Sequence, residues 1–263
     1  MKKLGKAYLA FVLLFLYAPI FVLIVFSFNE TKSRSVFSGF TFDWYIKLFN
    51  NEVIISSLVN TLIIAVLASI ISTILGTFAA IGINSMKKIP KTIVMNITNM
   101  PVINPEIVTG VSLMLLFVFF AARMNLEFGF VTLLIAHITF DVPYVILNIM
   151  PKFRQMDPHL YEAAMDLGCS PFQAFTKVVL PEIMPGIVSG FLMSFTYSLD
   201  DFVVSYFTSG STSQTLPITI YSMTRRRVSP EINALSTIIF VVVVIILVVK
   251  NAVENRQFKK NAA

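Results

Sequence analysis

The chain has 263 residues, of which 56% are hydrophobic and only 13% are charged, and its mean hydropathy is +0.81. Ordinary soluble domains carry about 25% charged residues, so the composition excludes a soluble domain. A single cysteine, Cys169, excludes an internal disulfide, and two histidines provide no usual zinc site, so we expect no metal centre. Basic residues at the ends of membrane spans explain the net charge of +6 better than nucleic-acid binding does.

Apolar runs longer than about 18 residues predict helices that cross a bilayer. We expect a single all-α membrane domain over residues 1–263, located in the cell membrane and in contact with lipid. Six spans are expected, over residues 7–28, 58–83, 92–121, 129–150, 185–207 and 232–249. Three lysines precede the first run, as in a signal peptide. Because that run exceeds the roughly 7 to 15 residues of a cleaved segment, we expect a retained helix.

The distribution of Lys and Arg predicts the orientation, because short cytoplasmic loops are enriched in them. With both ends inside, 13 basic residues are cytoplasmic: Lys2, Lys3, Lys6, Lys87, Lys88, Lys91, Lys152, Arg154, Lys177, Lys250, Arg256, Lys259 and Lys260. Seven are external: Lys32, Arg34, Lys47, Arg123, Arg225, Arg226 and Arg227. The count favours N-in and C-in. The run from Arg225 to Arg227 is an exception, because its three arginines lie on the external side in this orientation. It either faces a partner or is an ordinary solvated charge run.

The segment 151–184 between spans four and five is cytoplasmic in this orientation. We expect two short helices in it, over residues 158–167 and 170–179, each opened by an Asp or Ser followed by proline. Gly168 joins them as a C-terminal cap, and Pro181 ends the second. Spacing alone leaves two interpretations: a helix that inserts into a groove of a partner, or a hairpin packed on its own membrane domain.

Acidic residues lie within the predicted spans at Glu106, Asp141, Asp200 and Asp201. Each charged acid at the centre of a bilayer costs about 2.5 to 3.5 kcal/mol on insertion scales. These acids therefore indicate a cavity that faces water, partners or substrate. The alternative is that they are protonated or hydrogen-bonded inside the bundle.

The third and fifth spans carry the most informative patterns. Asn99, Pro101, Asn104 and Pro105 interrupt the third span just before Glu106, which is typical of a broken helix that lines a cavity. In the fifth span small residues recur every four positions and allow close approach of another helix. They are Gly186, Gly190, Ser194 and Ser198, with Asp201 on the same stripe and Asp200 beside it.

Aromatic and histidine side chains accompany these acids. Tyr197, Phe202 and Tyr206 lie close enough to offer ring faces to a cation, although each is individually more typical of packing. His137 and Asp141 have the i, i+4 spacing of a hydrogen-bonded pair on the fourth span. A structural pair is favoured there over a proton relay.

The cytoplasmic segment also carries a family motif. Glu162-Ala163-Ala164, then Gly168, then Leu180-Pro181 resembles the EAA motif of ABC importer permeases, with Val178 in place of isoleucine. The resemblance implies a type I ABC importer permease architecture, with a core transmembrane domain over 58–250. It also implies that this loop couples to a cytoplasmic ATPase. The implied ATPase contacts are Glu162, Ala163, Ala164, Asp166 and Gly168.

Further segments resemble the C-type permease subunit of spermidine/putrescine ABC importers. They are residues 194–205, 220–223, 228–235 and 137–140. The resemblance implies polyamine import with a second related permease, a cytoplasmic ATPase dimer and an external polyamine-binding protein. The implied substrate pathway comprises Asp200, Asp201, Glu106, Trp44, Tyr197 and Ser198. The chain contains no phosphate loop, so ATP and Mg²⁺ would be bound and ATP hydrolysed by the ATPase, and this chain is expected to be no enzyme.

Several alternatives remain open at the level of sequence. One is a permease for another cation, and another is a proton-coupled secondary transporter that uses His137, Asp141 and the Asp pair. A helical scaffold without transport activity is disfavoured by the cost of its buried acids. The preferred polyamine, the acid that contacts it and the subunit stoichiometry stay undetermined.

Overall fold

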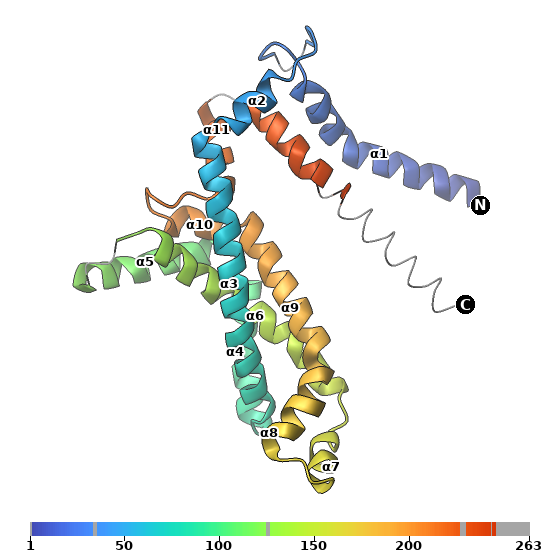
Figure 1. Cartoon of the computed structure of the whole chain (residues 1–263), viewed down its shortest axis with the longest axis vertical. Coiled ribbons are helices and arrows are strands. Elements are labelled where there is room, and N and C mark those ends of the chain that lie inside the picture. The colour runs from blue at the N-terminus through green and yellow to red at the C-terminus, as the bar shows by residue number, and fades with distance from the viewer. Residues whose placement is uncertain (1, 34–35, 125–126, 227–229, 243, 246–263) are drawn as a thin grey trace. The chain divides into compact units, whose positions relative to one another are not determined.

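The computed structural model of the chain describes residues 2–33, 36–124, 127–226, 230–242 and 244–245 (Figure 1). Helices are the regular structure of this part, and an isolated antiparallel bridge pairs Asn29 with Phe40. The chain divides into two compact units. The first comprises Met1–Ile55 and Ile220–Ala263, and the second comprises Ser56–Thr219.

Five of the described helical segments are long and apolar enough to cross a membrane. They are Tyr8–Ser27 in α1 (Lys2–Ser27), α3 (Glu52–Asn84), Glu106–Arg123 in α5 (Glu106–Met124), α6 (Phe130–Gln155) and the run Pro171–Asp200 that ends with α9 (Leu180–Asp200). The sixth expected span is represented by a shorter apolar helix, Pro230–Val242. Residues 243 and 246–249 of that expected span lie outside the described residues. The other helices are α2 (Asp43–Phe49), α4 (Lys88–Ile103), α7 (Leu160–Asp166), α8 (Pro171–Ala174), the π-helix η1 (Phe175–Val179), α10 (Val203–Thr208) and α11 (Leu216–Arg226).

In the first unit, the loop between α1 and α2 folds around a buried tryptophan. The Trp44 indole N–H donates to the carbonyl oxygen of Asn29 over 2.7 Å. The Asn29 side chain donates in turn to the carbonyl oxygens of Ser33 at 3.1 Å and Val36 at 3.0 Å. These bonds satisfy the polar groups that burial would otherwise leave without partners. The loop is therefore an ordered structure built on Trp44.

In the second unit, α6 and α9 pack side by side (Figure 1). A Cβ atom placed on Gly186 would lie 3.0 Å from the carbonyl oxygen of Asn148, and one on Gly190 would lie 3.2 Å from the Cα of Val145. The small-residue stripe predicted on the fifth span is thus confirmed as a helix contact. The Ser194 hydroxyl extends the contact to α3, where it lies 2.8 Å from the hydroxyl of Ser72.

The predicted interruption of the third span is confirmed at Asn104. This residue is extended, with φ −70° and ψ 141°, between α4 and α5. The cause is Pro105, because a proline disfavours the helical conformation of the residue before it. Pro105 then begins the next helix by accepting the N–H of Val108 over 2.9 Å. Pro101, by contrast, lies inside α4.

The prediction that the fifth span runs over 185–207 is wrong at both ends. The helical run begins at Pro171 and ends at Asp200, and the chain leaves the helix at Asp201, whose ψ is 122°. The Asp201 carboxylate accepts the backbone N–H of Val204 at 3.2 Å and of Ser205 at 2.7 Å. An Asp side chain that bonds backbone N–H groups competes with continuation of the helix, so α10 starts anew at Val203.

The first of the two helices predicted in the segment 151–184 ends as predicted at the Gly168 turn, where φ is +88°. The N–H of Gly168 bonds the carbonyl of Met165, and that of Cys169 bonds the carbonyl of Ala164, which is the Schellman pattern. Its predicted start is two residues early, because the Asp157 carboxylate accepts the N–H of His159 in a local turn before α7 begins.

The second helix predicted in this segment starts as predicted, since Ser170 and Gln173 form a reciprocal capping box. Its predicted end at Pro181 is wrong. The chain passes through the π-turn of η1, where the N–H of Leu180 bonds the carbonyl of Phe175, five residues back. A proline lacks the N–H that an α-helix requires, and Pro181 instead occupies the first turn of α9, where no such bond is needed.

We predict that Gly190→Leu lowers the stability of the purified protein by about 1–3 kcal/mol, because the added side chain forces α6 and α9 apart. Gly82→Leu is the matched control, since nothing lies within 4 Å of a Cβ at Gly82. Thermal unfolding in detergent measures both. Equal midpoints for the two variants would show that the α6 and α9 contact does not need a small residue at position 190.

Candidate functional site

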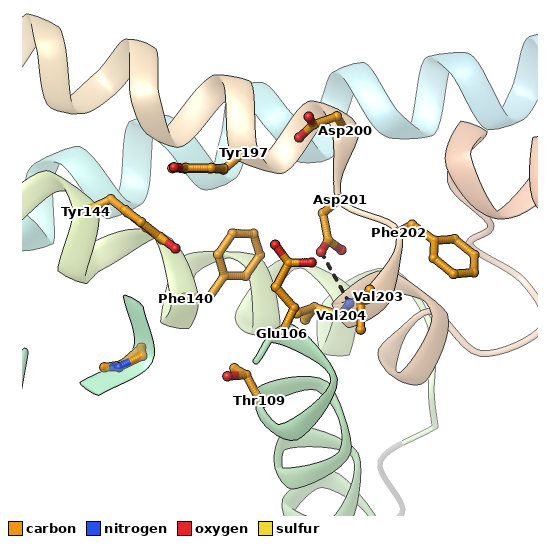
Figure 2. A pocket seen from close by; sticks show the side chains of 11 residues that line it. Glu106, Thr109, Phe140, Tyr144, Tyr197, Asp200, Asp201, Phe202, Val203 and Val204 are labelled. Atoms are coloured by element: carbon orange, nitrogen blue, oxygen red, sulfur yellow. Dashed lines mark hydrogen bonds between the residues drawn. The ribbon is translucent and has the colours of Figure 1, made fainter. Parts of the chain in front are cut away.

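A pocket of about 240 Å³ lies in the second unit where the two helix breaks meet α6 and α9 (Figure 2). It exceeds the roughly 150 Å³ cavity that accommodates benzene in an engineered protein. The space is therefore sufficient for part of a slender organic chain. The lining residues are Pro101, Glu106, Thr109, Phe140, Tyr144, Tyr197, Asp200, Asp201, Phe202, Val203 and Val204.

Three carboxylates reach this pocket from different elements. Glu106 lies in the first turn of α5, Asp200 is the last residue of α9, and Asp201 lies in the break before α10. Figure 2 shows the Glu106 and Asp201 side chains extending toward the same space. The structure thus brings together three acids that the sequence analysis assigned to the substrate pathway.

The electrostatics of the pocket favour a cation. Asp200 adds its charge to the carbonyl end of α9, which already carries partial negative charge from the helix dipole. Glu106 occupies the amino end of α5, where a negative charge is stabilised, so its carboxylate is well tolerated there. The 11 described residues that line the pocket include no Lys or Arg.

The two adjacent aspartates are held differently. Asp200 is an exposed residue on the pocket wall. The Asp201 side chain is only 6% exposed, and its oxygens accept the two backbone N–H groups of α10. Asp200 is therefore the more accessible charge, whereas Asp201 both contributes charge and fixes the start of α10.

Aromatic rings form the wall opposite the acids. Tyr144 and Tyr197 have their ring centroids 4.4 Å apart, and Phe140 lies one turn before Tyr144 on α6. Tyr197 and Phe202 are confirmed as pocket residues, but Tyr206 is not among the lining residues. The sequence analysis missed Phe140 and Tyr144. The spacing of these two residues from His137 and Asp141 places all four on one face of the helix, and this pattern could have predicted them.

Ser198 and Trp44 are not among the residues that line the pocket. Ser198 is buried behind the wall, where its hydroxyl donates to Oδ2 of Asp141 over 2.8 Å. Trp44 belongs to the first unit, and its N–H is bonded within the loop there. A direct substrate contact for either residue therefore stays a prediction.

His137 and Asp141 are joined through a third residue. The predicted direct hydrogen bond between them is replaced by the Ser198 hydroxyl, which bonds His137 Nδ1 at 3.0 Å and Asp141 at 2.8 Å. Sequence spacing on one helix could not reveal a partner on α9, because that contact depends on tertiary packing. The pair is buried and does not line the pocket.

The segment 151–184 exposes most of the residues assigned to ATPase contact. Glu162, Ala163, Asp166 and Gly168 are exposed, whereas Ala164 is buried in the packing of the loop itself. Two large apolar side chains outside the assigned ATPase contacts flank the Gly168 turn: Leu167 is 88% exposed and Phe172 is 75% exposed. Large apolar side chains that protrude from a polar loop are typical of a protein contact.

Comparison with known proteins places the chain among transport components. Residues 72–256 match the family described as binding-protein-dependent transport system inner membrane component. The chain is 37% identical to the spermidine/putrescine transport system permease protein PotC of Haemophilus influenzae, over 96% of this chain and 97% of that protein. It is 35% identical to PotC of Escherichia coli K12, covering 94% and 92% of the two chains. It is 40% identical to the putrescine transport system permease protein PotI of the same strain, covering 86% and 81%.

Solved structures share the fold. A bacterial ABC transporter involved in the import of the acidic polysaccharide alginate superposes with a TM-score of 0.71 at 14% identity, covering 97% of this chain and 95% of that one. The bacterial alginate ABC transporter in complex with its pentasaccharide-bound periplasmic protein gives 0.69 at 18% identity, covering 94% and 91%. An amino acid ABC transporter with histidines gives 0.53 at 22% identity, covering 77% and 94%.

The family match spans more than half of the chain, and the permeases of both bacteria match most of its length. These relatives are membrane transport subunits rather than enzymes. The chain belongs to the binding-protein-dependent transport system inner membrane components, the permease subunits of ABC importers.

Proposed function

We propose that this chain forms half of the translocation pathway of an ATP-driven importer for polyamines, spermidine or putrescine. The observation that carries the proposal is the pocket with three carboxylates and aromatic walls. A polyamine carries ammonium groups separated by methylene segments. Carboxylates bind the ammonium groups, and ring faces attract cations and pack against methylenes. The sequence relatives named for spermidine and putrescine transport support the same cargo.

The shared fold does not decide the cargo. The alginate transporter has the same fold, yet its cargo is an acidic polysaccharide. A negatively charged pocket repels such an anion and attracts a cation, so the side chains of the second unit provide the discrimination. These contacts are expected to be individually weak, because a site that binds too tightly would not release its cargo.

The partners of the proposed complex follow from the same argument. A second related permease would close the pathway, and an external binding protein would deliver the polyamine, as the periplasmic protein bound to the alginate transporter suggests. A cytoplasmic ATPase dimer would hold ATP and Mg²⁺ and contact the loop around Gly168. Six spans with both termini in the cytoplasm place that loop on the ATPase side, consistent with the distribution of basic residues.

A permease for another small organic cation is the second candidate, because the same pocket chemistry supports it. A proton-coupled secondary transporter is a weaker alternative. It receives support only from the buried His137 and Asp141 pair, and the family contains ABC importer components. Uptake that follows a proton gradient without any ATPase would favour it.

We predict that Asp200→Asn together with Glu106→Gln lowers uptake of radiolabelled spermidine or putrescine at least tenfold at subsaturating substrate. The physical reason is the loss of two charge-assisted contacts, each worth about 1.5–3 kcal/mol. Uptake is measured in proteoliposomes containing the complete complex, at equal amounts of permease.

Glu182→Gln is the control for this double variant, since Glu182 lies in the first turn of α9 and does not line the pocket. Unchanged uptake in the double variant, with normal uptake in the control, would contradict the assigned pathway. Equal losses in the two would point to a general effect of removing a carboxylate from this chain.

We predict that Leu167→Ser together with Phe172→Ser releases the ATPase subunit, because the two exposed apolar side chains lose the area they bury on docking. Retention of the ATPase on affinity-tagged permease is measured in detergent, and we expect at least a fivefold loss. Glu162→Lys should act in the same direction through charge, whereas Glu52→Lys, at the start of α3, should retain the ATPase. Full retention by both loop variants would exclude this loop as the docking surface.

A further inference from the structure

One buried side chain bridges the break between α9 and α10. His137 of α6 has no exposed surface. Its Nδ1 lies 3.0 Å from the hydroxyl of Ser198 on α9, and its Nε2 lies 2.9 Å from the hydroxyl of Ser205 on α10. A single imidazole thus holds the helical residues on both sides of the break at Asp201.

The direction of every bond in this network is fixed by its hydrogens. The Ser198 hydroxyl has one hydrogen and donates it to Asp141 Oδ2 over 2.8 Å. The bond between His137 and Ser198 therefore needs the hydrogen on Nδ1. A neutral imidazole then has no hydrogen on Nε2, which accepts the hydroxyl hydrogen of Ser205. The chain of donors runs from Ser205 through His137 and Ser198 to Asp141.

Ser205 connects this network to the pocket. Its backbone N–H donates to Asp201 Oδ2 over 2.7 Å, and the same oxygen lies 3.7 Å from His137 Nε2. Any displacement of Ser205 would therefore move the carboxylate of Asp201. Asp200 precedes it directly in the chain as the last residue of α9, so the backbone angle at the break sets how far apart the two carboxylates lie (Figure 2).

We propose that His137 is a positioning residue that sets the separation and direction of the Asp200 and Asp201 carboxylates, and so selects polyamines by the spacing of their ammonium groups. The inference rests on the proposed function, since it concerns how the same pocket recognises its cargo. His137 does not line the pocket and contacts no substrate there. It acts through Ser198, Ser205 and the break between the two helices.

The position of His137 suits this role. Its ring packs at a tilt of 55° against that of Phe140, with ring centroids 5.2 Å apart, and Phe140 lines the pocket one turn further along α6. The close packing of α6 on α9 at Gly190 holds the two helices at a fixed separation. A rigid support with two directed hydrogen bonds holds a carboxylate more accurately than a flexible loop does.

Single and double variants test the proposal in proteoliposomes containing the complete complex. His137→Leu removes both bonds, His137→Gln can remake a donor and an acceptor, and Ser205→Ala removes only the link to α10. Thr139→Ala on the same helix is the control, because its hydroxyl bonds only the carbonyl of Ile135 on its own helix. The readouts are the amount of assembled complex, KM and Vmax for putrescine and spermidine, and the KM ratio of putrescine to the longer diamine cadaverine.

We expect His137→Leu to raise KM for putrescine at least tenfold and to change the putrescine to cadaverine ratio at least threefold, per assembled complex. His137→Gln should return KM for putrescine and the putrescine to cadaverine ratio most of the way to the wild-type values. Ser205→Ala should change both quantities in the same direction as His137→Leu, by a smaller factor. The double variant His137→Leu with Ser205→Ala should be no worse than His137→Leu alone, since both remove one shared link.

A purely structural role for His137 predicts something different: less assembled complex, with KM and the diamine ratio unchanged in the complexes that form. That result would overturn the proposal. If His137→Leu fails to assemble, the Ser205→Ala variant provides the test. An unchanged KM ratio of putrescine to cadaverine in Ser205→Ala would then overturn the proposal. If the wild-type complex imports no polyamine, the proposed function itself is contradicted. If the wild-type complex imports polyamines but the variants keep its KM ratio of putrescine to cadaverine, only the inference about His137 is contradicted.

Discussion

The core of a bilayer offers no hydrogen-bond partners, so every backbone group released at a helix break must be satisfied within the protein. Among the described residues, the chain leaves the helical conformation at Asn104 and at Asp201, and both breaks border the same pocket. At the second break the Asp201 carboxylate satisfies two N–H groups of α10. The same carboxylate also lines the pocket, so the interruption brings an acidic group to the pocket wall.

The pocket and the Gly168 turn are connected by one continuous helical run. It extends from Pro171 to Asp200, and 30 helical residues span about 45 Å. Its lower end begins at the Gly168 turn that exposes Leu167 and Phe172, and its upper end carries Asp200 into the pocket. A stiff element that joins both sites offers a direct path by which movement of the loop displaces the carboxylates. The π-turn near Pro181 lies between them and marks where the run departs from regular α-helix.

The pocket illustrates how a common fold acquires a particular cargo. The alginate transporter and this chain share backbone architecture at 14% identity, whereas the charge of the pocket depends on a few side chains. Glu106, Asp200 and the rings of Tyr144 and Tyr197 lie on elements that the fold places together. Substitution of such residues can change whether the pocket favours an anionic or a cationic cargo, without repacking the core between α6 and α9.

Composition and local pattern were sufficient for several conclusions. Apolar run lengths predicted long apolar helices, the residues around Pro105 predicted one helix break, and Gly168 predicted the turn that ends α7, because hydropathy and backbone restriction act locally. Tertiary structure alone decided that the fifth span stops at Asp200, since Asp201 prefers the N–H groups of a later helix. It also decided that Ser198 stands between His137 and Asp141, because residues 57 and 61 positions apart meet only when α6 and α9 pack.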